Sequence, residues 1–314
     1  MILLLQYTLL FAAVLLLVAL GGCFSERSGV INIGLEGIMV IGALGGALVM
    51  KFIPVELGAP VVILTTILAS ALAGMLFSLL LAVAAINFKA DQTITGTAMN
   101  MLATAAATVA VKAMNTAASG GSDVSSDIIY TRARDLFIVR IGNFEFNWFM
   151  LVALIALLVS WVVLYKMKFG LQMRACGEHP QAADSVGINV YKMRYSGVMI
   201  SGLLGGIGGI VYITAGVSSW KFENGVAGFG FLALAVMIFG QWKPFKIALA
   251  ALLFGFFRAL GNVYTGFDIL KNLNLPSTMY NMLPYIVSLI VLALTSKKSL
   301  APKAEGIPYD KGSR

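Results

Sequence analysis

Long apolar runs constrain this chain more than any other feature. The 314 residues are 59% hydrophobic and only 11% charged, whereas a soluble domain carries about 25% charged residues. A soluble protein of this size would need a more polar surface, so the excess apolar side chains must face lipid. Helical runs of about 20 apolar residues cross a bilayer. The sequence therefore predicts an all-α, polytopic membrane protein.

We expect about nine transmembrane helices. The predicted spans are residues 3–22, 30–50, 59–87, 93–115, 148–166, 195–216, 227–241, 246–263 and 280–296. They make up one transmembrane domain over residues 1–296, interrupted by an external loop at 116–147 and a basic cytoplasmic loop at 167–194. The remaining residues, 297–314, form a short polar cytoplasmic tail that we expect to be disordered.

Basic residues set the predicted orientation. The net charge is +8, from 22 Lys and Arg against 14 Asp and Glu. Lys and Arg gather around the 167–194 loop, in the turn at 243–246 and in the tail, and such clusters mark the cytoplasmic side. The 116–147 loop and the N-terminus then lie outside, although three arginines in that loop run against the rule.

Weak internal sequence similarity divides the chain into two groups of spans. Residues 96–102 read GTAMNML and residues 277–283 read STMYNML, while Gly-rich segments lead into apolar runs at 28–42 and 224–240. Two groups of four spans around one connecting span would have opposite orientations. Inverted repeats of this kind, with interrupted helices, place transporter sites at the repeat interface. Chance similarity between apolar sequences is the alternative.

The most informative polar segment is SERSGVINIGLEGIM, residues 25–39. Asn32 and Glu36 are four residues apart and share a face of a helix, while the glycines around them weaken that helix. A carboxylate in a span is costly unless it is paired or faces a polar cavity. Glu36 therefore either bonds a neighbouring span or, with Asn32, lines a translocation route. We favour the route.

A second polar segment begins the span at 93–115. Gln92, Thr95 and Asn100 supply donors and acceptors that suit a neutral polar ligand, although threonines in spans also bond back to their own helix. Asn281 is the counterpart of Asn100 if the repeat is real. The rings of Trp220 and Phe222 can stack on a ligand or anchor the chain at the interface. The predicted substrate pathway comprises Asn32, Glu36, Gln92, Thr95, Asn100, Trp220, Phe229 and Asn281.

Catalytic and energy-coupling motifs are missing. The sequence has no GxxxxGK[ST] to cradle ATP phosphates and no HExxH or GxSxG. Two isolated cysteines and one histidine predict no metal site. We therefore expect no cofactor on this chain and no enzymatic activity, so that uphill transport would draw energy from another subunit.

The basic loop contains a candidate docking element. Pro180 suits the first position of a helix, and QAADSVG forms a short helix that ends at Gly187. A short helix held between two spans makes a rigid contact for a partner. An ordinary capped turn is the alternative.

Several motifs together resemble the permeases of ABC importers in the ribose/branched-chain amino acid class. SERSGVINIGLEGIMVIGA resembles the second span of these permeases. GLQMRACGEHPQAADSVGINV, followed by SGLLGGIGG, is similar to their coupling loop and the next span, and GFGFLALAVMIFGQWKP to their third signature. These segments cover most of residues 25–260 in order. The match is closest to the shorter permease subunit of nucleoside importers that use basic-membrane-protein-type lipoproteins.

This resemblance implies a permease in a bacterial cytoplasmic (inner) membrane, paired with a longer homologous permease as a heterodimer. Cytoplasmic ATPase subunits would bind ATP and Mg²⁺, and an external lipoprotein would deliver the substrate, most directly a purine nucleoside, with a simple sugar or other small solute as alternatives. The implied coupling residues are Gly177, Glu178, His179, Pro180, Ala182, Ala183, Asp184 and Gly187. His179 stands where the class more often has Asn, a better helix N-cap.

An ion-coupled secondary transporter is the alternative from a different class. It would need a coupling-ion site of its own, and the spans contain few carboxylates from which to build one.

Overall fold

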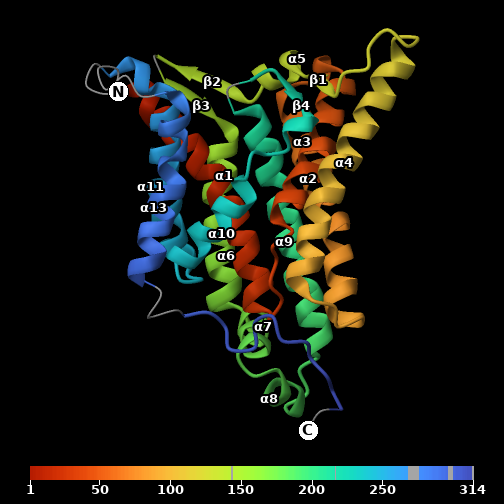
Figure 1. Ribbon diagram of the computed structural model, residues 1–314, viewed down its shortest axis with the longest axis vertical. Helices are drawn as coiled ribbons and strands as arrows, with labels where there is room; N and C mark the ends of the chain where they lie inside the picture. Colours follow the sequence, from red (N-terminus) through yellow and green to blue (C-terminus); the bar gives the residue numbers. More distant parts are fainter. Residues whose placement is uncertain (143, 216, 268–275, 296–299, 313–314) are drawn as a thin grey trace.

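The structure is a single bundle of long helices. A computed structural model of the chain describes residues 1–142, 144–215, 217–267, 276–295 and 300–312. A cap of short strands covers one end of the bundle, beside the N-terminus (Figure 1). Two short helices, α7 (Lys168–Glu178) and α8 (Pro180–Ser185), lie at the opposite end near the C-terminus.

Seven helices within the described residues are long and apolar enough to cross a membrane. They are α1 (Ile2–Arg27), α2 (Leu35–Phe52), α3 (Ala59–Ala82), α4 (Gln92–Ala118), α6 (Trp148–Lys166), α9 (Val190–Thr214) and α11 (Pro244–Val263). The helix α13 (Ser277–Thr295) follows near the end of the chain. The all-α, polytopic fold predicted from the apolar runs is confirmed.

The predicted span at 227–241 is shorter than expected. Its helix, α10 (Phe229–Phe239), has 11 residues and rises about 16 Å, roughly half of a hydrocarbon core of about 30 Å. Each of the nine predicted segments contains a helix, but the count of nine complete spans is not confirmed. The predicted span was too long because hydropathy detects the apolar run but not the turn before the helix. In that turn Gly225 and Gly228 have positive φ.

The predicted outer loop is folded in large part. Strand β1 (Asp127–Ile129) pairs antiparallel with β4 (Ser219–Lys221), and β2 (Ile138–Ile141) pairs with β3 (Phe144–Asn147). The remaining short elements are η1 (Val55–Leu57), η2 (Val83–Asn87), α5 (Thr131–Asp135), η3 (Phe222–Asn224) and η4 (Tyr264–Gly266). Asn115, near the end of α4, fastens this cap because its Nδ2 donates to the carbonyls of Ser125 (3.0 Å) and Asp127 (2.9 Å).

Side-chain caps explain where several helices begin. Asp91 Oδ1 accepts a hydrogen bond from Ile94 N (2.9 Å) at the start of α4, and Asn147 Oδ1 accepts one from Phe149 N (3.0 Å) at the start of α6. Both side chains satisfy an N–H that has no partner within the helix. Pro244 is the first residue of α11, where its missing N–H costs nothing.

Small residues bring α2, α3 and α9 close together at the centre of the bundle. A Cβ atom at Gly42 would lie 2.6 Å from Gly206 O, and one at Gly74 would lie 2.7 Å from Gly206 Cα. The hydroxyl of Ser70 donates to Gly42 O at 2.6 Å. Glycine and serine at such crossings let helix backbones approach closely in membranes, so α9 forms the buried axis around which the other helices pack.

The segments that connect the helices lie at two opposite ends of the bundle. The N-terminus and the folded 116–147 segment lie at one end of the bundle, whereas α7, α8 and the C-terminal residues lie at the other (Figure 1). Consecutive helices therefore place the basic loop and the tail on one side.

The C-terminal tail contradicts the expected disorder. Residues 300–312 pack against the end of the bundle, where Ala304 N donates to Gly177 O (2.8 Å) and Gly306 N donates to Gly29 O (3.3 Å). The Tyr309 side chain is only 4% exposed. Its ring joins a buried cluster with Cys176, Ala183, Val190 and Met193. Composition predicted disorder because it cannot reveal partners that come from distant parts of the chain.

Candidate functional site

Two helices begin inside the bundle, and their starts meet. The helix α2 follows the irregular, non-helical segment 28–34 and leads toward the strand cap, whereas α10 follows a turn at 225–228 and leads toward α7 (Figure 1). A Cβ atom at Gly230 would lie 2.5 Å from Glu36 Cα. The first N–H groups of any helix lack partners within the helix, so buried helix starts need acceptors from elsewhere. We call this meeting point the junction.

Glu36 supplies acceptors for the start of α10. Its Oε1 accepts from Gly228 N and its Oε2 from Gly230 N, both at 2.7 Å. The residue also lies in the first turn of α2. A carboxylate is favoured at a helix N-terminus, where N–H groups and the helix dipole concentrate positive potential. Glu36 therefore joins the two half-helices through one side chain.

Side chains of α4 hold the start of α2. Asn100 Oδ1 accepts from Gly37 N (2.8 Å), and its Nδ2 donates to Ile33 O (3.0 Å). Gln92 Oε1 accepts from Ile31 N (2.7 Å). These two amides supply hydrogen bonds that the irregular segment 28–34 lacks within its own backbone, as irregular backbone inside a membrane domain requires.

Two buried side-chain amides at the irregular segment 28–34 have polar atoms without hydrogen-bond partners. Asn32 is fully buried, and its Nδ2 donates to Ser201 Oγ of α9 at 2.9 Å. Asn32 Oδ1 and Gln92 Nε2 have no hydrogen-bond partner among the described residues. One is an acceptor and the other a donor. The segment before α2 therefore keeps one buried acceptor and one buried donor without a partner among the described residues.

Aromatic rings and one arginine surround the start of α10. The Tyr212 ring lies between those of Trp220 and Phe229, with centroid distances of 5.5 and 4.3 Å. The Arg258 guanidinium lies over the rings of Phe11 (5.7 Å) and Phe229 (5.5 Å) and hydrogen-bonds to Tyr212. An arginine within a span is costly and marks functional regions. The junction thus combines a carboxylate, an arginine and aromatic faces.

Most of the predicted pathway residues gather at the junction. Asn32, Glu36, Gln92 and Asn100 surround the start of α2, Phe229 begins α10, and Trp220 reaches it through Tyr212. Thr95 does not take part, since its hydroxyl donates to Asp91 O of its own helix (2.7 Å). The side chain of Asn281 lies outside the described residues.

Sequence reasoning missed Arg258, Tyr212, Tyr285 and Ser201. Tyr285 donates to Ala227 O (3.2 Å) in the turn before α10. A signal existed for Arg258, because it is a charged residue within the apolar run at 246–263. The other three carry no such signal, since tyrosine and serine are ordinary residues in spans.

The opposite end of the bundle contains the predicted short helix. The α8 helix begins at Pro180, and after it Gly187 N donates to Asp184 O (2.9 Å) with a φ of +85°. His179 occupies the N-cap position without a side-chain hydrogen bond to the helix. The proline start, the glycine stop and the weak histidine cap are confirmed.

The eight predicted coupling residues differ in exposure, and two of them, Glu178 and Asp184, are half-buried. Gly177, Pro180 and Ala183 are buried, whereas His179, Ala182 and Gly187 are exposed. Glu178 lies 3.8 Å from Arg27 Nη1, and Asp184 lies 3.9 Å from Lys311 Nζ. The exposed group, together with Val186 (76% exposed), forms the surface that a partner can touch. We call α7, α8 and residues 300–312 the platform.

A carboxyl pair joins the platform to α1. Glu26 Oε2 accepts from Trp242 Nε1 (2.5 Å), and Glu305 of the tail hydrogen-bonds to Glu26. Burial raises the pKa of Glu305 to about 7, although the Glu26 hydrogen bond and the charge of Arg27 lower it in part. Two carboxyl groups can share a hydrogen bond only if one holds a proton.

Comparison with known proteins identifies the family. The family model described as "Branched-chain amino acid transport system / permease component" matches residues 4–292. The chain belongs to this family. It is therefore a multi-pass membrane permease component of an ABC transporter and not an enzyme.

Three relatives extend this assignment. The guanosine ABC transporter permease protein NupQ of Bacillus subtilis is 45% identical over 312 residues, covering 98% of this chain and 96% of the relative. The nucleoside ABC transporter permease protein NupC of Lactococcus lactis is 40% identical over 307 residues (96% and 95%). The guanosine ABC transporter permease protein NupP of B. subtilis is 25% identical over 247 residues (76% and 68%). No solved structure gives a significant match.

Proposed function

We propose that the chain is a translocation subunit of an ABC importer for nucleosides, with purine nucleosides such as guanosine as the first candidates. The observation that carries this proposal is the match, along nearly the whole chain, to permeases named for guanosine and nucleosides at 45% and 40% identity. A match of this extent includes the junction, the platform and every long helix.

The chemistry of the junction supports a solute of this kind. A nucleoside offers hydroxyls, amide-like base edges and an aromatic ring. Asn32 Oδ1 and Gln92 Nε2 provide the free acceptor and donor, and Trp220, Tyr212 and Phe229 provide ring faces on which a base stacks. We propose that transport separates the starts of α2 and α10 and exposes these groups, so that the bonds of Glu36 hold the closed state.

The exposed face of α4 supports a shared pathway. Hydroxyl and amide side chains recur at three- and four-residue spacing and are exposed or half-buried: Thr93, Thr97, Asn100, Thr104 and Thr108. Such a stripe suits a polar pathway better than lipid, because lipid offers no hydrogen bonds. We propose that a second, homologous permease completes the pathway along this face. That B. subtilis has two guanosine permeases related to this chain, NupQ and NupP, supports a heterodimer.

The platform supports a coupling role. We propose that the exposed face of α8 docks a cytoplasmic ATPase subunit that binds ATP and Mg²⁺, and that an external lipoprotein delivers the nucleoside at the strand cap. The protein then resides in the bacterial cytoplasmic membrane with α8 inside. The tail connects the platform helices to α1: Ala304 bonds to Gly177 of α7, Lys311 pairs with Asp184 of α8, and Glu305 bonds to Glu26 of α1. Movements of the ATPase can therefore be transmitted through the tail to the segment that precedes α2.

Reconstitution tests the proposal. The complete transporter is placed in proteoliposomes with its ATPase subunits and lipoprotein, and uptake of tritiated guanosine is measured with and without ATP. We expect uptake that requires ATP and is reduced by excess unlabelled adenosine but not by glucose. ATP-driven uptake of glucose alone would replace nucleosides by sugars. Guanosine uptake by this chain alone, driven by an ion gradient, would overturn the ABC assignment.

A further inference from the structure

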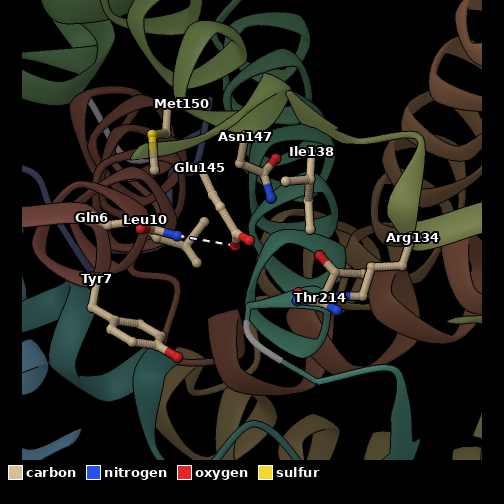
Figure 2. A pocket seen from close by; sticks show the side chains of 9 residues that line it. All are labelled: Gln6, Tyr7, Leu10, Arg134, Ile138, Glu145, Asn147, Met150 and Thr214. Atoms are coloured by element: carbon tan, nitrogen blue, oxygen red, sulfur yellow. Dashed lines mark hydrogen bonds between the residues drawn. The ribbon is translucent and has the colours of Figure 1, made fainter. Parts of the chain in front are cut away.

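A polar pocket lies at the capped end of the bundle, away from the junction. It has a volume of about 190 Å³ and is bounded by the starts of α1 and α6, the strands β2 and β3, and the end of α9. Figure 2 shows Glu145 and Asn147 pointing into it from one side and Arg134 from another. The proposed function does not use this pocket.

Opposite charges face each other across the pocket. Arg134 Nε donates to Thr214 O (3.2 Å), which fixes the guanidinium at one wall. Glu145 Oε2 accepts from Gln6 Nε2 (3.2 Å), and its Oε1 accepts from the exposed Arg140 (3.3 Å). An exposed ion pair such as that with Arg140 is weak and exchangeable. The pocket therefore offers one fixed cationic and one anionic group to a ligand.

An apolar groove continues from the pocket along the same helices. This second cavity, also of about 190 Å³, lies between α1, α6 and α11, and Met150 lines both cavities. Its lining includes Leu9 and Leu16 of α1 with Leu154 and Leu157 of α6. Leu154 is 52% exposed, so the groove is open toward the membrane.

The two cavities have the dimensions of one leaflet. From Gln6 in the polar pocket to Leu16 in the groove, α1 rises about 15 Å at 1.5 Å per residue. Half of a hydrocarbon core of about 30 Å has the same depth. A polar pocket at the membrane surface above an apolar groove one leaflet deep matches a phospholipid, with a polar headgroup above an acyl chain.

We propose that the pocket and the groove together form a specific site for a phospholipid with a primary ammonium headgroup, that is, phosphatidylethanolamine of the outer leaflet. Arg134 binds the phosphate, because guanidinium groups pair with phosphate through charge-assisted hydrogen bonds. Glu145 and Gln6 receive the ammonium, whose three N–H groups need acceptors. One acyl chain lies along Leu9, Leu16, Leu154 and Leu157.

Native mass spectrometry of the purified full-length chain tests this site. Phosphatidylethanolamine, phosphatidylcholine and phosphatidylglycerol of identical acyl chains are titrated in separate samples. We expect phosphatidylethanolamine to bind at least several-fold more tightly than the other two, since the choline headgroup has no N–H and the glycerol headgroup no cation. Equal binding of phosphatidylcholine, or tighter binding of phosphatidylglycerol, would overturn the role of Glu145.

Matched variants locate the binding. Arg134→Gln should weaken phosphatidylethanolamine binding about tenfold, whereas Arg132→Gln, in the same short helix but outside the pocket, should not. Leu154→Trp should obstruct the groove, whereas Ile155→Trp, which is exposed and outside it, should leave binding intact. Equal effects within either pair would contradict the site. Displacement of bound lipid by guanosine would instead assign the pocket to the solute.

Discussion

The junction and the platform both bury carboxyl groups, but they satisfy them in opposite ways. At the junction, each oxygen of Glu36 accepts a backbone N–H of α10, and no proton is needed. At the platform, Glu305 meets another carboxyl group, Glu26, and Glu305 Oε2 has no hydrogen-bond partner among the described residues. The junction is thus held by fixed backbone dipoles, whereas the contact between Glu26 and Glu305 depends on a proton. We call this contact between the platform and α1 the clasp.

This difference implies different requirements for two movements, the opening of the junction and the separation of Glu305 from Glu26. Opening the junction requires charge-assisted hydrogen bonds to break together, each of which contributes about 1.5–3 kcal/mol, so external work has to drive it. Separating Glu305 from Glu26 requires only the loss of a proton, while the backbone hydrogen bonds of Ala304 and Gly306 still hold the tail. The junction therefore suits a gate that opens when the proposed ATPase subunits bind ATP. The contact between Glu26 and Glu305 suits an adjustable link between the platform and this gate.

The largest expected effect follows from removing the Glu36 carboxylate. Glu36→Ala leaves the N–H groups of Gly228 and Gly230 without acceptors, at a combined cost of about 3 kcal/mol or more. We expect guanosine uptake to be abolished and the thermal midpoint in detergent to fall by on the order of 10 °C. Glu36→Gln keeps one acceptor oxygen, so its uptake and thermal midpoint should lie between those of the native chain and of Glu36→Ala. Glu56→Ala, at an exposed acid, is the control, and an equal loss there would remove the special role of Glu36.

A smaller loss should follow from crowding the junction. Gly230→Ala adds a Cβ atom 2.5 Å from Glu36 Cα and 2.8 Å from its Oε2, and overpacking of this kind costs about 1–3 kcal/mol. Uptake should fall severalfold and the thermal midpoint by a few degrees. Gly266→Ala places a Cβ atom in open space and should change neither. If both variants behave alike, the close approach of α2 and α10 is not what the position requires.

At the platform, substitutions on α8 should affect transport without affecting stability. Val186→Glu puts a charge on the exposed face, whereas Ala183→Glu puts one into the buried cluster around Tyr309. We expect Val186→Glu to lose ATP-driven uptake and to keep its thermal midpoint, and Ala183→Glu to lose both. These are measured by uptake in proteoliposomes and by thermal unfolding. Normal uptake in Val186→Glu would argue against docking through this face.

The smallest effect concerns pH. Burial raises the pKa of Glu305 from about 4.5 to about 7, so the docked tail binds more protons than the released tail between these values. The contribution of Glu305 to docking is complete below about pH 4.5 and is lost as pH rises through about 7. Hydrogen exchange of residues 300–312 should therefore be faster at pH 8 than at pH 5, after correction for intrinsic rates. Glu305→Gln should flatten this dependence, and an unchanged slope would exclude the clasp.

The sequence predicted the positions of the helices well because hydropathy measures the property that places a helix in lipid. It also placed Asn32, Glu36, Gln92 and Asn100 in one region, since polar residues at span starts are rare and costly. It could not show that Glu36 and Asn100 bind backbone groups of interrupted helices. That role depends on two segments about 190 residues apart meeting in space.

Other features were out of reach for similar reasons. Residues 227–241 have the composition of a span, yet positive φ angles at Ala227 and Gly228 delay the helix start. The tail has a polar composition, yet Tyr309 and Glu305 find buried partners on α7, α9 and α1. Both outcomes are decided by tertiary contacts, which composition and periodicity do not contain.

Transport is expected to separate the starts of α2 and α10. Spin labels at Thr97 of α4, beside the start of α2, and at Phe231 of α10, both exposed, report this distance by double electron–electron resonance in the complete transporter in nanodiscs. We predict a second, longer distance when ATP is bound and hydrolysis is blocked, and its loss when α8 carries Val186→Glu. The same single distance in the nucleotide-free and ATP-bound states would contradict the claim.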